Sequence, residues 1–153
     1  MREILFRGKS TQGDGWVEGS YMEHYFSSRH GRVYAIFWND DSSCQTYRTP
    51  VVPETVGQYT GLTDKNGKKI FEGDIIKSDN GKQSAVSVIK FGEYYPKMFY
   101  EMLDMYIPGK RHLPSCDFYA ESINKHEEMI LFQSTCVEVI GNIHDNPDLL
   151  DEK

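Results

Sequence analysis

The sequence predicts a mainly β protein, which we class as a β-rich α+β fold. Aromatic residues make up 13% of the chain, with ten Tyr and eight Phe, and strands favour aromatic side chains. Short apolar runs are separated by clusters of Gly, Asn, Asp and Pro, which are typical of turns between strands. Helical spacing is clearest in residues 96–106, so one short helix is expected within the C-terminal half.

Size and charge limit the classes of protein to consider. The 153 residues suffice for one domain or two small ones, and 39% apolar with 26% charged residues indicates a packed core. A formal charge of −6 opposes non-specific binding to DNA or to an anionic membrane. We interpret a group of neighbouring lysines as solubilising residues that protect the edges of exposed hairpins. These are Lys65, Lys68, Lys69, Lys77 and Lys82.

The three cysteines, Cys44, Cys116 and Cys136, indicate reduced thiols. Their number is odd, their spacings are wide and no CxxC occurs, so neither a disulfide framework nor a cysteine zinc site is predicted. The opening MREILFRGKS has no apolar stretch of signal-peptide length, and no transmembrane run follows. We therefore expect a cytoplasmic protein with no membrane partner.

The first part of the chain, residues 1–57, is predicted as an N-terminal antiparallel β region. A turn at 12–15 joins two strands that could form a hairpin, and the apolar run 32–38 is placed in the core. Pro50 and Pro53 disfavour a central strand and indicate an extended connector before a single helical turn. The predicted strands are 3–7, 16–21, 32–38 and 45–49, and the helical turn is 54–57.

The stretch GQYTGLTDKNGKKIFEGDIIK, residues 57–77, predicts a hairpin. Residues 64–67 are interpreted as a type I turn that ends with Gly67 in the left-handed region, between two short strands. Gly73 permits a sharp change of direction, and the carboxylate of Asp74 can accept hydrogen bonds from neighbouring amides.

Two other interpretations of this stretch, a calcium-binding loop and a phosphate-binding loop, do not fit the spacing of its residues. Taken as an EF-hand loop starting at Asp64, the stretch has Asn66 at the third position, which fits. It has a lysine at both the fifth and the sixth position, and it ends on Ile75 where a bidentate Glu is required. No GxxxxGK[ST] occurs, and no GxGxxG opens a helix, so a phosphate cradle is not predicted either.

The C-terminal part is predicted to run from 58 to 145, with an insertion at about 92–134 and a tail at 146–153. Within the insertion, 96–106 has apolar residues at helical spacing, and its Met-rich face could be core or a partner surface, with core preferred. A helix over 116–128 competes with two strands in the same region. The predicted strands are 58–63, 69–71, 84–91, 118–123, 129–132 and 137–140, with an end or bulge at 141–142 and a short tail helix at 149–150.

Three blocks of the sequence together resemble the YopX-like family, phage and prophage proteins whose biochemical role is unassigned. They are RE-x-x-FRGKS at 2–10, PETVGQYTGLTDKNGKKIFEGDIIK at 53–77 and VEVIGNIHDNPDLL at 137–150. The segment 92–134 departs from the pattern. The resemblance implies a small SH3-like barrel in the C-terminal part, and a bacterial host or phage-infected cell as the setting. It brings no catalytic residues.

The first functional hypothesis is a non-catalytic protein-binding or assembly module. Small β-barrels expose aromatic grooves that take peptides or single-stranded nucleic acid. The net negative charge favours a protein partner over nucleic acid, which stays an alternative, and a homo-oligomer is also expected. The candidate contacts are Tyr59, Tyr94, Tyr95, Phe99 and Tyr100, although core or interface packing is preferred for most of them.

The second hypothesis is a small enzyme or metal site built from scattered residues. None of the five histidines forms HExxH or an i, i+4 pair with another, and no GxSxG or nucleophilic cysteine signature occurs. Glu23, His24 and His126 are the residues to inspect for a site assembled in three dimensions. No cofactor is predicted, and a non-catalytic role is preferred.

Overall fold

The computed structural model describes residues 3–13, 15–25, 31–40, 42, 45–79, 84–94, 115–123, 128–130 and 136–151. The described residues up to Gly61 form one compact unit, and those from Leu62 on form a second. The boundary falls inside the strand β5, Gly57–Thr63, so this strand starts in the first unit and ends in the second.

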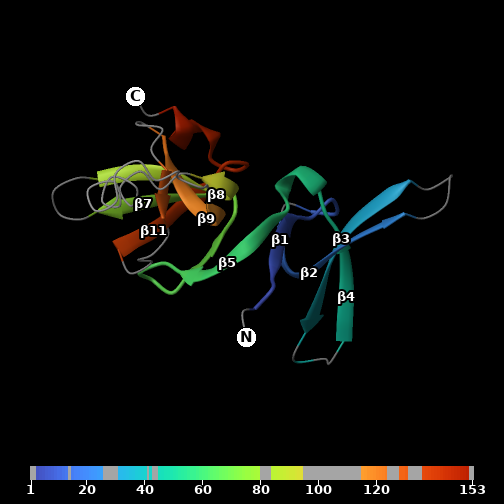
Figure 1. Ribbon diagram of the computed structural model, residues 1–153. Coiled ribbons are helices and arrows are strands. Elements are labelled where there is room, and N and C mark those ends of the chain that lie inside the picture. The colour runs from blue at the N-terminus through green and yellow to red at the C-terminus, as the bar shows by residue number, and fades with distance from the viewer. Residues whose placement is uncertain are drawn as a thin grey trace. The chain divides into compact units, whose positions relative to one another are not determined.

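The first unit is an antiparallel sheet with the strand order β4-β3-β2-β1-β5. Figure 1 shows β2 and β3 forming one hairpin and β3 and β4 forming another that leaves in a different direction. The predicted pairing of the first two strands is confirmed, although β1 begins later than the expected 3–7. The strands are β1 Phe6–Lys9, β2 Trp16–Tyr25, β3 Arg32–Asp40, β4 Gln45–Pro50 and β5.

The connector after β4 is held by one threonine. The hydroxyl of Thr55 accepts a hydrogen bond from the backbone N–H of Lys9 at 2.9 Å and donates one to the carbonyl of Val52 at 2.7 Å. The backbone N–H of Val52 in turn donates to the carbonyl of Lys9 at 2.9 Å. The predicted helical turn is thus the 3-10 turn η1, Pro53–Thr55, bonded to the end of β1.

Gly19 lies where β2 changes partners. Residues Trp16 to Gly19 pair with β1, and the pairing with β3 begins at Ser20, opposite Phe37. A Cβ atom on Gly19 would lie 2.1 Å from the carbonyl oxygen of Phe37 and 3.0 Å from a methyl carbon of Ile36. Only glycine lets the backbones of β2 and β3 approach so closely at the point where β2 leaves β1 and begins to pair with β3.

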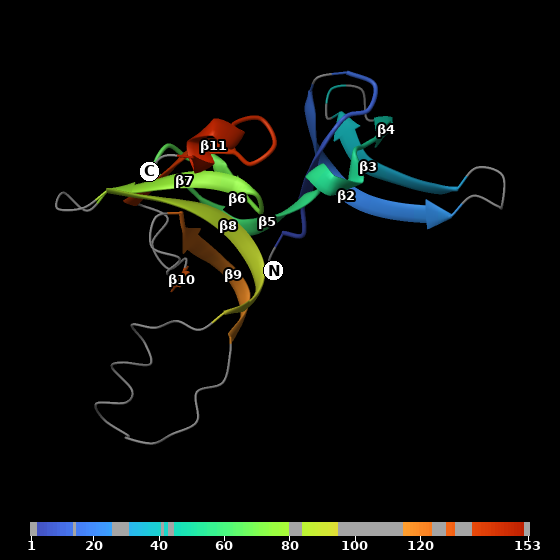
Figure 2. The same ribbon diagram turned by 90° about the horizontal axis from the view of Figure 1, so that it is seen from above.

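The second unit contains the end of β5, the strand β6 (Lys69–Phe71) and a five-stranded antiparallel sheet of order β10-β9-β8-β7-β11. Figure 2 shows β8 curving strongly along its length between β7 and β9. The sheet strands are β7 Asp74–Asp79, β8 Ser84–Tyr94, β9 Ser115–Ser122, β10 Glu128–Ile130 and β11 Val137–Asn142. The 3-10 turn η3, Pro147–Leu150, follows β11.

The core of the second unit is apolar and mostly aliphatic. It gathers side chains from five strands, with Leu62 of β5 packed against it. The isoleucines of β7 and β8 are almost fully buried, and the removal of their side chains from water stabilises this unit. The core residues are Ile70, Ile76, Ile89, Phe118, Ala120, Val137 and Val139.

One buried hydroxyl in this unit has no hydrogen-bond partner among the described residues, that of Ser87 on β8. A buried polar group without a partner loses the free energy of its hydration. Ser87→Ala is therefore expected to leave the free energy of unfolding unchanged or to raise it by about 1 kcal/mol. Urea unfolding checks this, with Ser78→Ala, a half-buried serine that donates to the carbonyl of Ala85, as the control for a bonded serine. A clear loss of stability in Ser87→Ala would contradict the expectation.

The predictions for the C-terminal part of the chain are confirmed in some places and wrong in others. Residues 115–122 are the strand β9, so the competing helix over 116–128 is wrong where the structure describes it. The expected bulge is present, since the register of β11 against β7 shifts between Val139 and Gly141. The predicted helix at 96–106 lies outside the described residues. Among the described pairings β10 and β11 are the edges of an open sheet, so a closed SH3-like barrel is not part of the described fold.

Candidate interaction surface

The Asp64 turn is the most densely bonded polar feature of the second unit. The N–H of Gly67 donates to the carbonyl of Asp64, the N–H of Asp64 donates to the carbonyl of Lys68, and Gly67 has a φ of 82°. This geometry confirms the predicted turn. The carboxylate of Asp64 accepts hydrogen bonds from the backbone of Asn66 at 2.8 Å and of Lys68 at 2.9 Å.

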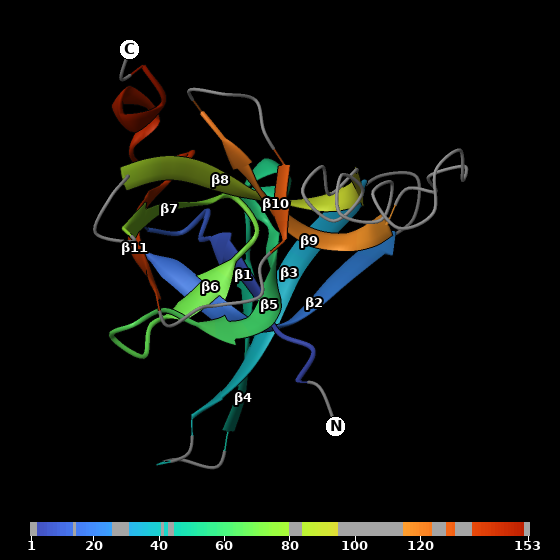
Figure 3. The same cartoon turned by 60° about the vertical axis from the view of Figure 1, so that its left-hand side comes forward.

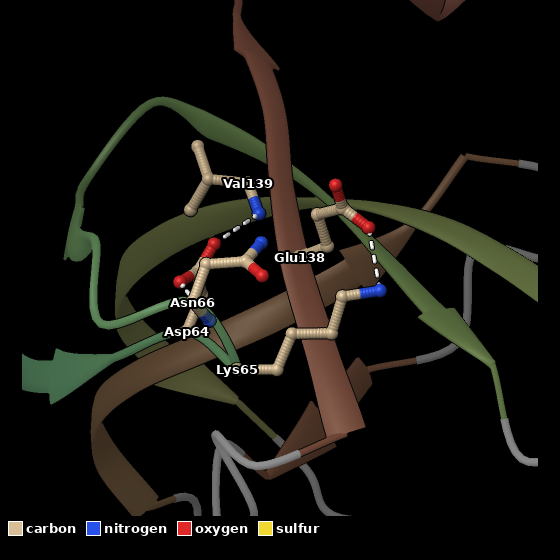
Figure 4. A network of polar contacts seen from close by, with 5 residues as sticks. All are labelled: Asp64, Lys65, Asn66, Glu138 and Val139. Atoms are coloured by element: carbon tan, nitrogen blue, oxygen red, sulfur yellow. Dashed lines mark hydrogen bonds and ion pairs between the residues drawn. The ribbon is translucent and has the colours of Figure 1, made fainter.

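The same carboxylate reaches a strand far away in sequence. Its second oxygen accepts a hydrogen bond from the N–H of Val139 at 3.0 Å (Figure 4). The N–H of Lys65 donates to the carbonyl of Val137 at 3.0 Å. The N–H of Val139 and the carbonyl of Val137 lie on the edge of β11 that does not face β7. The turn therefore closes part of a sheet edge that could otherwise pair with another strand.

Opposing effects act on the pKa of Asp64, which is only 5% exposed. Burial alone would raise the pKa, but the three amides of Val139, Lys68 and Asn66, together with the charge of Lys68, outweigh it. The net result is a pKa below the ordinary value of 3.8. Since both oxygens already accept backbone bonds, the structure also argues against the calcium reading of this loop.

The five candidate contact residues are not brought together on a described surface. Tyr59 is 7% exposed, and Tyr94 is 5% exposed and stacks on Tyr119 with ring centroids 5.1 Å apart. Such side chains offer little area to a partner in this conformation. Tyr95, Phe99 and Tyr100 lie outside the described residues, and a contact role for the five stays a prediction.

A different surface emerges from the pairing of β2, β3 and β4. Directly paired residues share a face of a sheet, and here Met22 pairs with Ala35 while Phe37 pairs with Arg48. These side chains line a shallow hollow of about 170 Å³ in the first unit. Its full lining is Met22, His24, Val33, Ala35, Phe37 and Arg48, which we call the β2–β4 groove.

The lining of the β2–β4 groove is mostly apolar, with His24 and Arg48 as its polar side chains. Met22, in the middle of β2, is 48% exposed. The hollow is smaller than the roughly 300–1,000 Å³ of ordinary small-molecule pockets, so it suits one or two side chains of a partner.

The opposite face of the same strands is aromatic. Trp38 and Tyr47 stack with ring centroids 4.7 Å apart, and the indole N–H of Trp38 donates to the hydroxyl of Thr49 at 3.0 Å. Tyr47 is still 38% exposed. No contact residue was predicted here from the sequence, although residues 32–38 carry apolar or aromatic side chains on both faces of one strand.

The residues inspected for an enzyme or metal site do not assemble into one. Glu23 forms an ion pair with Arg32 at 2.9 Å, His24 lines the β2–β4 groove, and His126 lies outside the described residues. In the described part of the chain, no group of three or more His, Cys, Asp or Glu residues could hold a metal ion. No described helix has the length and apolar character needed to cross a bilayer.

The fold and this surface define a class of protein: a two-unit antiparallel β protein with an exposed, partly apolar sheet region. The model of the YopX protein family matches residues 5–151, nearly the whole chain, and the protein belongs to the YopX family. The sequence resemblance is thereby confirmed.

The chain is similar to the crystal structure of protein EF1440 from Enterococcus faecalis, at 21% identity and a TM-score of 0.47, over 99% of this chain and 100% of that chain. No curated protein matches the sequence.

Proposed function

We propose that this YopX-family protein is a non-catalytic protein-binding or assembly module that uses the strands β2, β3 and β4 as its contact region. The observation that carries the proposal is the β2–β4 groove, where Met22 is largely exposed beside Phe37 and Arg48. An exposed methionine beside half-buried apolar side chains and an arginine fits a protein contact surface, because Met and Arg are enriched in such surfaces.

Charge supports a protein partner over nucleic acid. With a formal charge of −6, the chain lacks the overall positive charge that draws proteins to phosphate backbones. The single arginine of the groove, Arg48, is suited to a carboxylate on a partner rather than to a run of phosphates. Nucleic-acid binding is the alternative, and a strong salt dependence of binding would favour it.

Three finer expectations belong to the same proposal. An SH3-like barrel in the C-terminal unit is supported by the family resemblance and by the hairpin and meander of β5 to β9. A cytoplasmic location is supported by the free, exposed thiol of Cys116. A phage or prophage origin rests on the resemblance alone.

The proposal predicts that Met22→Asp removes binding without unfolding the protein. A carboxylate at this position replaces the apolar contact and has to be removed from water when a partner covers the groove, so partner binding should fall at least tenfold. The measurement is size-exclusion chromatography with light scattering, with and without host lysate fractions. Ile4→Asp, the same change at a side chain 69% exposed and outside the groove, is the control. Equal complex formation by both variants would contradict the assignment of the groove.

A further inference from the structure

The edge strand β4 presents a short row of main-chain groups that no described residue bonds. The N–H of Val51 donates to the carbonyl of Tyr34 at 2.9 Å, which fixes these two as a hydrogen-bonded pair. Hydrogen-bonded and non-hydrogen-bonded pairs alternate along an antiparallel ladder. The register of β3 against β4 then makes Phe37 with Arg48, and Asn39 with Thr46, non-hydrogen-bonded pairs.

Residues in non-hydrogen-bonded pairs direct their N–H and C=O groups away from their partner strand. On β4 the outward groups therefore belong to Thr46, Arg48 and Pro50. Pro50 has no N–H, and its carbonyl accepts a hydrogen bond from the N–H of Thr11 at 3.0 Å. The N–H and C=O groups of Thr46 and Arg48 remain, on a stretch of strand that is exposed throughout.

The edge strands β11 and β4 differ in what bonds their outward groups. On β11 the Asp64 turn bonds the outward groups of Val137 and Val139. On β4 no described turn or side chain does so, and the strand carries no lysine and no internal proline to deter pairing. Figure 3 shows β4 as the strand that lies along β3 at the outer end of the first unit's sheet.

We propose that β4 pairs antiparallel with β4 of a second copy of this chain, about a two-fold axis that passes through Tyr47. This inference rests on the proposed function and deepens it by naming the partner of the assembly. In this register Thr46 lies opposite Arg48 of the other copy, so all four outward groups of each strand are bonded. The two β4 strands then join two sheets into one.

Charge and aromatic contacts select this register over its neighbour. Shifting the axis to Arg48 would place two arginines directly opposite each other, which is unfavourable, and would set Thr46 against the bonded Pro50. With the axis at Tyr47, the two exposed tyrosine rings meet on the face where each already stacks on Trp38. The pairing thereby covers an aromatic surface that water contacts in the single chain.

Disulfide trapping tests the register directly. In an antiparallel non-hydrogen-bonded pair the Cα atoms lie about 4.5 Å apart, within the roughly 4.4–6.8 Å that a disulfide spans. Tyr47→Cys, in a background where Cys44, Cys116 and Cys136 are serine, is expected to give a covalent dimer under mild oxidation. Gln45→Cys in the same background is the control, because its counterpart is Thr49 and not itself. Trapping of Tyr47→Cys at no greater rate than Gln45→Cys would overturn the proposal.

The native assembly gives a second test that needs no cysteine. Light scattering on the wild-type chain is expected to show a mass that rises from 17.7 kDa toward twice that value with concentration. Thr46→Pro removes an outward N–H that β3 does not use, so it should abolish the rise while the circular dichroism spectrum is kept. A wild-type chain that stays monomeric, or a Thr46→Pro variant that dimerises as well as the wild type, would contradict the β4 pairing. If a monomer still forms a Met22-dependent complex with another protein, the proposed function survives that failure.

Discussion

Asp64→Ala is expected to destabilise the second unit by about 3–5 kcal/mol, because three backbone amides lose a buried charged acceptor together. Two of these amides belong to the turn itself, and the third is that of Val139 on β11. The change therefore loosens a hairpin and uncovers a sheet edge at the same time. Urea unfolding measures the loss, and hydrogen exchange of the Val139 amide should accelerate well before global unfolding.

A nearby ion pair provides the matched control for Asp64. Glu138 lies between Val137 and Val139 on β11, and its carboxylate contacts the ammonium group of Lys65 at 2.6 Å (Figure 4). Both side chains are more than 40% exposed, so water and salt screen this pair. Glu138→Gln should leave the unfolding midpoint close to that of the wild type. An equal loss for the two variants would mean that charge on this side of the sheet matters, and that the amide bonds of Asp64 do not.

The contribution of Asp64 should depend on pH in a definite direction. Its pKa in the folded protein is below 3.8, and the unfolded chain titrates near that value. The stabilisation is therefore complete above the unfolded pKa and is lost as the pH falls through the lower, folded pKa. The difference in unfolding free energy between wild type and Asp64→Asn should be constant at neutral pH and shrink below about pH 4. A difference that persists unchanged in acid would contradict the charged state of this carboxylate.

Gly19→Ala is expected to lower the free energy of unfolding of the first unit by about 3 kcal/mol. The new methyl group would lie 2.1 Å from the carbonyl oxygen of Phe37, so a backbone has to move where β2 passes from β1 to β3. Since the β2–β4 groove starts just beyond this point, the loss should extend to the proposed binding surface. Thermal unfolding measures the effect, as a fall in Tm of at least about 10 °C.

Gly13→Ala is the control for the loss of glycine itself. No described atom lies within 4 Å of a Cβ at this position, and its φ is outside the positive region. The expected change is between zero and a gain of about 1 kcal/mol, because alanine restricts the unfolded chain. If Gly13→Ala and Gly19→Ala destabilise equally, backbone entropy rather than the contact with Phe37 explains the requirement for glycine.

Turns and strand content could be predicted because their signals are local. The turn at Asp64–Gly67 follows from residues that form their own hydrogen bonds and tolerate a positive φ, and the strands around it follow from short apolar runs. The connector before η1 was predictable for a similar reason, because Pro50 and Pro53 disfavour a central strand. The strand β9 was ambiguous with a helix, because a short apolar run has no clear period and its pairing with β8 decides the matter.

The sequence by itself determined the family, the mainly β class and the turn chemistry, because each depends on residue types at fixed spacing. Only the tertiary structure decided which groups meet across long separations: the carboxylate of Asp64 with the amide of Val139, and the backbone of Gly19 with that of Phe37. It also decided that Met22 and Arg48 border one groove while Tyr59 and Tyr94 are buried. These outcomes depend on strand register, and a shift of one residue reverses the face that every side chain occupies.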